Sequence, residues 1–82
     1  MTVRERILHR QVLLEDLYEY HFATAGQALI IEDFDGNAEL RLAYQYLAEK
    51  GYVDLFVDEH GVNAQIRTAG IETVEAGRTT IH

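Results

Sequence analysis

Apolar residues recur at helical spacing from position 3 to position 22. When successive residues are placed at steps of about 100°, one side carries mostly apolar residues, namely Val3, Ile7, Leu14, Leu17, Tyr18, His21 and Phe22. The other side carries polar residues, namely Glu5, His9, Glu15, Asp16 and Glu19. This pattern predicts an amphipathic helix over residues 3–22.

Four apolar residues of this predicted helix lie off its main apolar side. Leu8 and Val12 fall one turn apart on one flank, and Leu13 and Tyr20 fall on another. One interpretation is a first helix that the rest of the fold covers on several sides. The other is a surface for a partner protein or for a second copy, and it predicts self-association through Leu8, Val12, Leu13 and Tyr20.

Residues 24–34 fit two kinds of element. Thr24 with Gln27 three positions later is typical of a capping box, which predicts a short helix. The apolar run 28–31 would equally suit a buried strand. We expect a short helix here and keep the strand as the alternative.

A break at Asp35-Gly36-Asn37 precedes the next predicted helix. Asp35 or Asn37 can cap it, and the apolar residues Leu40, Ala43, Tyr44 and Leu47 share one face. Gly51 follows Lys50 where a left-handed glycine commonly ends a helix. The sequence therefore predicts a helix that stops at Gly51.

After Gly51 the apolar period changes from helical spacing to alternation. If residues 58–61 form a loop, the pairs are Val53 with Ile66, Leu55 with Ala64 and Val57 with Val62, all on one face. A β-hairpin is therefore predicted. A short helix around residues 71–74 follows, and we expect one domain over residues 1–77 with a frayed tail at 78–82.

Two stretches resemble the winged helix-turn-helix superfamily. The run LRLAYQYLAEKGYV (residues 40–53) is similar to a recognition helix and its junction with the wing. The run IRTAGIETVE (residues 66–75) resembles the end of the wing and the start of the last helix. Their order and spacing are similar to those of small bacterial and phage regulators of the MarR and PadR kind.

This resemblance implies a fold of the α+β class. The expected architecture is a small winged helix-turn-helix with a three-helix core, a β wing of two or three strands and a short C-terminal helix. One departure is Arg67, which stands where the family commonly has Thr, with Thr68 one position later. The last helix is therefore expected to be capped one residue out of register.

The resemblance also implies DNA binding and transcription regulation. Arg41 and Gln45, one turn apart, are side chains that read guanine and adenine edges in a major groove. The candidate nucleic-acid contacts are Asn37, Arg41 and Gln45 on the helix, and Asn63 and Arg67 on the outward face of the wing. Arg4, Arg6 and Arg10 add positive charge to the first helix.

The charge balance argues against strong DNA binding. The chain has 14 acidic and 7 basic residues, a net charge of -7, and the predicted wing tip Asp58-Glu59-His60 is acidic. Because DNA repels such a surface, any DNA binding is expected to be weak and dependent on salt. The alternative is an acidic winged-helix protein-interaction module, with Tyr46 and Phe56 as exposed aromatic candidates.

The remaining composition points away from catalysis, metals and membranes. There is no cysteine, the four histidines are scattered, and no nucleophile stands beside a base in the sequence. No apolar run approaches the length of a membrane span, and the start of the chain lacks a signal-peptide pattern. We therefore expect no enzyme activity, no cofactor, no metal and a cytoplasmic location.

Overall fold

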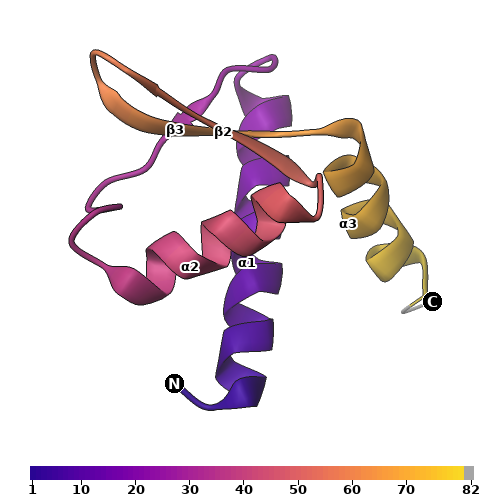
Figure 1. The fold of residues 1–82 in the computed structure, drawn as a ribbon. Coiled ribbons are helices and arrows are strands. Elements are labelled where there is room, and N and C mark those ends of the chain that lie inside the picture. Colours follow the sequence, from indigo (N-terminus) through magenta and orange to yellow (C-terminus); the bar gives the residue numbers. More distant parts are fainter. Residues whose placement is uncertain (81–82) are drawn as a thin grey trace.

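The computed structural model describes residues 1–80, and the side chains of residues 1–77. It belongs to the α+β class, with three helices and a three-stranded antiparallel sheet in this part of the chain (Figure 1). The elements are α1 (Val3–Ala23), β1 (Leu29–Ile30), α2 (Ala38–Glu49), β2 (Val53–Asp58), β3 (Gly61–Ile66) and α3 (Thr68–Thr80).

The first helix begins and ends almost where the sequence predicts. Thr2 and Glu5 form a capping box, in which each side chain accepts a hydrogen bond from the other's backbone N–H. Leu14 and Leu17 are buried, whereas Val3, Ile7 and Phe22 are exposed. The predicted apolar side therefore enters the core only through the middle and second half of α1.

The short helix expected over residues 24–34 is wrong, and the strand alternative is confirmed for Leu29–Ile30. Thr24 is the C-cap of α1, and its hydroxyl accepts a hydrogen bond from Gln27 N–H without starting a new helix. Ala25 and Gly26 follow with φ of 56° and 92°, which turns the chain back toward β3. Pairing with β3 satisfies the backbone groups that a helix would otherwise have bonded internally.

The helix α2 carries both of its predicted end signals. The Asn37 side chain accepts a hydrogen bond from Leu40 N–H at 3.1 Å, so Asn37 is the N-cap. Gly51 adopts φ of 78°, and Tyr52 N–H bonds the Leu47 carbonyl at 3.0 Å. This Schellman arrangement directs the chain from α2 into β2.

The predicted hairpin register is confirmed. Val53 pairs with Ile66, Leu55 with Ala64 and Val57 with Val62. The loop is shorter than expected, because Asp58 and Gly61 also pair and leave residues 59 and 60 at the tip. The strand β3 lies between β1 and β2, in the order β1-β3-β2.

The last helix is longer than the short one expected. It spans Thr68–Thr80 and so includes the first residues of the predicted tail, while residues 81–82 lie outside the described part of the chain. Gly70 is buried near the start of α3, and a β-carbon there would collide with the Tyr52 carbonyl. The absence of a side chain at Gly70 therefore lets α3 lie against the junction between α2 and β2.

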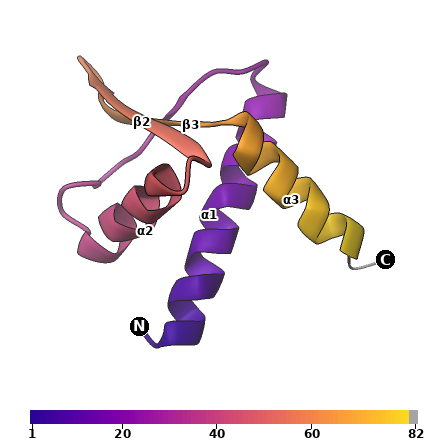
Figure 2. The ribbon, with the colours of Figure 1, turned by 45° about the vertical axis from the view of Figure 1, so that its right-hand side comes forward.

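The core lies between one face of the sheet and the three helices (Figure 2). Its buried members are Leu14, Leu17, Ile31, Tyr44, Leu47, Val53, Ala64, Ile66 and Val74. They come from the three helices, from β2 and β3 and from Ile31, which directly follows β1, and the partly buried Leu29 of β1 packs against them. The first turns of α1 extend beyond α2 and α3 toward the N-terminus in both views (Figures 1 and 2).

Candidate functional site

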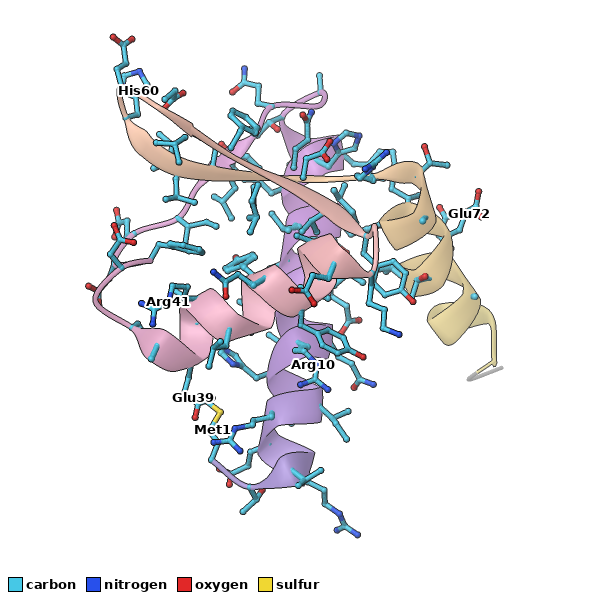
Figure 3. All side chains as sticks on the ribbon, in the orientation of Figure 1. Met1, Arg10, Glu39, Arg41, His60 and Glu72 are labelled. Atoms are coloured by element: carbon cyan, nitrogen blue, oxygen red, sulfur yellow. The ribbon has the colours of Figure 1, made fainter. Side chains whose placement is uncertain are left out.

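A shallow groove runs between the first turns of α1 and the outer side of α2. Its volume is about 260 Å³. We call it the α1/α2 groove, and its lining residues are Arg6, His9, Arg10, Glu39, Leu42, Ala43 and Tyr46. Figure 3 shows Glu39 and Arg10 along this side of α2, whereas Arg41 points toward the loop before α2.

An ion pair closes one end of the groove. The Arg6 guanidinium donates two hydrogen bonds to the Glu39 carboxylate, at 2.8 and 3.2 Å. The hydrogen bond from Arg6 lowers the pKa of Glu39 and raises the pKa of Arg6. Both side chains are well exposed, so this pair fixes their orientation and adds little to stability.

Aromatic and apolar side chains form the other end of the groove. The Arg10 guanidinium lies 4.1 Å from the centre of the Tyr46 ring, and the Lys50 ammonium lies 5.7 Å from it. Such contacts between a cation and a ring hold both groups in place while leaving the ring edge open. Leu42 is 58% exposed and Tyr46 41% exposed, which places apolar surface beside two cations.

The predicted nucleic-acid residues on α2 have different roles. The Asn37 side-chain oxygen is used in the helix cap. Arg41 is half-buried and donates to the Asp35 carbonyl at 3.1 Å. Gln45 is exposed on the outer side of α2.

Of the two predicted nucleic-acid contacts on the wing, Asn63 is buried. Asn63 lies on the outer side of the sheet, as expected from alternation, but it is only 4% exposed and cannot reach a duplex. Its amide donates to the Gly61 carbonyl at 3.1 Å, and it also bonds the Asp58 carboxylate. Exposed apolar residues in register with it, Ile30 and Phe56, stand on either side in the sheet.

Arg67 remains exposed, but it has an acidic neighbour. Its guanidinium lies 3.4 Å from the Asp54 carboxylate. Gln65, next to it on the outer face, donates to the Gly26 carbonyl at 2.6 Å. The outer face of the hairpin therefore has one exposed cation, and an anion partly neutralises it.

The outer side of α2 and the hairpin carry exposed acidic residues. These are Glu49, Asp54, Asp58 and Glu59. At the tip, hydrogen bonds from the Asn63 side chain and from His60 N–H lower the pKa of Asp58, which keeps it charged near neutral pH. The predicted acidic wing tip is thus part of a broader acidic surface.

The apolar residues that lie off the main side of α1 divide into two groups. Leu8 and Val12 are exposed, at 59% and 43%. Leu13 is half-buried and packs against the core, and Tyr20 is half-buried as well. Of these two groups, Leu8 and Val12 form the more open surface, because Leu13 packs against the core.

The sequence singled out several residues that line the groove, but it did not predict that they lie together. The exposure of Tyr46 was predicted and is confirmed, as is that of Phe56. Arg6 and Arg10 were interpreted as general positive charge, although their spacing of one turn already places them on one side of α1. What the sequence does not contain is the angle at which α1 crosses α2, which joins them to Leu42 and Tyr46.

Within the described residues, no group of three or more His, Asp or Glu side chains is arranged to hold a metal ion. In that part of the chain, too, no helix is both long and apolar enough to cross a membrane. Comparisons of the chain with protein-family models, with curated proteins and with solved structures found no match.

Proposed function

We propose that this chain is a winged-helix-like protein-interaction domain that binds a partner protein in the α1/α2 groove. The observation that carries the proposal is the open apolar surface of Leu42 and Tyr46 beside Arg10 and Lys50. Exposed aromatic and arginine side chains grouped in a concave site are typical of the anchors of protein interfaces. The winged-helix assignment is supported by the order of the elements and by the sheet order β1-β3-β2.

The charge distribution supports a protein partner over DNA. In a winged-helix regulator, α2 and the hairpin would face the duplex. Here Arg41 donates to a backbone carbonyl, Arg67 lies beside the Asp54 carboxylate, and the hairpin tip adds the exposed carboxylates of Asp58 and Glu59. Few cations are left to contact phosphates. Contacts between cations and phosphates supply most of the affinity of DNA-binding proteins.

The chemistry of the groove specifies the kind of partner segment. Leu42 and Tyr46 would contact apolar side chains, and Arg10 and Lys50 at the same end would attract carboxylates. An amphipathic helix with an apolar face and an acidic edge combines both features. The groove contains the main cluster of cations near α2, so it is where an acidic segment meets the least repulsion from a chain of net charge -7.

Affinity capture with matched variants tests this proposal. We expect Leu42→Glu to lose the bound partner, because a carboxylate enters the apolar part of the groove, and Arg10→Glu to weaken binding. Gln45→Glu is the control, since it adds the same charge on the same helix outside the groove lining. Equal capture by all three variants would contradict the proposal.

A titration against duplex DNA tests the competing prediction. We expect only weak binding that disappears between low and physiological salt, because few cations face a duplex. Tight binding that resists salt and is lost in Arg41→Ala would instead support a DNA-binding regulator.

A further inference from the structure

A second apolar surface lies on α1, on the side away from the groove. Leu8 and Val12 are exposed and one turn apart. Leu8 is two residues from both Arg6 and Arg10, which places it about 160° around the helix from them. Since Arg6 and Arg10 face α2, the flank of Leu8 and Val12 points away from α2.

The position of this flank makes it accessible to a large partner. The first turns of α1 extend beyond α2 and α3 in both views (Figures 1 and 2). The buried residues of the helix begin only at Leu14. A second helix can therefore lie along this part of α1 without meeting the rest of the domain.

Charge is divided along α1 in a way that indicates which helix fits. The first half carries Arg4, Arg6 and Arg10 with one carboxylate, Glu5, and the second half carries Glu15, Asp16 and Glu19. At steps of three or four residues, Arg4, Leu8, Val12, Glu15 and Glu19 follow one flank in that order. The flank is thus basic at one end, apolar in its middle and acidic at the other end.

A surface with this order of charges is complementary to itself when reversed. We propose that two copies of the chain pack α1 against α1 in antiparallel orientation, about a two-fold axis near residue 10. Leu8 then contacts Val12 of the second copy, and Arg4 lies near Glu15 of the second copy. Each contact occurs twice, as a two-fold interface requires.

The parallel alternative fits poorly. It would place Arg4 beside Arg4 and Glu15 beside Glu15, adding like-charge contacts to chains that already carry -7 each. The antiparallel pair also leaves both α1/α2 grooves open, because they lie on the other side of each α1. Dimer formation is therefore independent of the partner binding proposed above.

Sedimentation equilibrium tests the interface. We expect Leu8→Glu and Val12→Glu each to raise the dimer Kd at least about tenfold, since each places a charge in an apolar contact. Leu42→Glu is the control, because it adds the same charge to an equally exposed leucine in the groove. It should lose the partner and keep the dimer, so the two proposals fail separately.

Charge reversal tests the orientation. Arg4→Glu and Glu15→Arg should each raise the Kd about threefold, and the double variant should return it close to the native value. A native chain that stays monomeric to millimolar concentration overturns the proposal. So does a double variant that is weaker than either single one.

Disulfide cross-linking tests which residues of the two copies lie close together. Cysteines can be introduced one at a time, because the native chain has none. A mixture of Leu8→Cys and Val12→Cys chains should form a disulfide between copies. Glu19→Cys should not, since two copies of residue 19 lie roughly 27 Å apart along an antiparallel pair centred at residue 10. Efficient cross-linking through Glu19→Cys would indicate a parallel pair and overturn the proposal.

Discussion

At the residue scale, the burial of the Tyr44 hydroxyl has a measurable consequence. Tyr44 is buried in α2 against the sheet. Burial raises its pKa above the usual value near 10, and the Asp16 carboxylate raises it further. The neutral form is therefore favoured in the folded chain more than in the unfolded chain.

We predict that this tyrosine makes the fold sensitive to alkali. Because its folded pKa is raised, its contribution to stability is complete below pH 10 and is lost as the pH rises through the raised pKa. Urea unfolding from pH 8 to pH 11.5 measures this loss. Tyr44→Phe should keep more of its stability over that range, and identical pH profiles for the two chains would contradict the prediction.

Two glycines of α3 should respond in opposite ways to the same substitution. Gly70→Ala places a β-carbon against the Tyr52 carbonyl and 2.8 Å from Ile66 Cγ1, so we expect a loss of about 1–3 kcal/mol. Gly77→Ala meets nothing within 4 Å, so we expect a gain of up to about 1 kcal/mol from helix propensity. Denaturant unfolding of both variants checks the difference, and a stable Gly70→Ala chain would show that α3 can shift.

At the scale of elements, the sequence predicts those whose signals are local. The helix α2 has its cap at Asn37 and its stop at Gly51, and the hairpin register follows from simple alternation. The helix predicted over residues 24–34 was wrong because the strand there forms only by pairing with β3, which is distant in the sequence. For the same reason the groove was not predictable, since it depends on the crossing of two helices.

The start of α3 has an unusual cap. The Arg67 carbonyl accepts the hydrogen bond from Ile71 N–H at 2.9 Å, which is the backbone bond of an N-cap residue, and Thr68 is the first helical residue. Thr68 therefore does not occupy the cap position that the shifted motif suggested. Arginine cannot accept hydrogen bonds from the first turn through its side chain.

We predict that Arg67→Ser stabilises the domain. A serine at this position can accept a bond from the first turn of α3, which is worth about 0.5–1.5 kcal/mol. Arg67→Ala is the matched control, because it removes the same exposed contact with Asp54 without adding a cap. Thermal and urea unfolding of the two variants give the difference, and equal stability would refute the role of the cap.

At the scale of the whole molecule, the two proposed surfaces share one helix and divide its sides. Basic residues gather on the projecting first turns of α1, while exposed carboxylates lie at the C-terminal end of α2, at Glu49, and on the hairpin. The positive and negative charges of the molecule are thus separated in space, in addition to its net negative charge. This arrangement would direct acidic partners to the N-terminal end of the molecule and keep other polyanions away from the hairpin.

The strand order β1-β3-β2 also bears on how the chain opens and closes. The helix α2 and the hairpin form one continuous stretch, residues 38–66, whereas β1 joins β3 by closing a long loop between Leu29 and Ala64. Only two residues of β1 contribute to that pairing, so we expect it to form after the hairpin, because closing the loop costs chain entropy. The Ile31 amide donates a hydrogen bond to the Val62 carbonyl at 2.9 Å. We expect native-state hydrogen exchange to show this amide exchanging through a partial opening, whereas the hairpin amides exchange only on global unfolding. Such an opening would transiently expose the edge of β3 that pairs with β1. The β1 segment would then be the least stable part of the sheet.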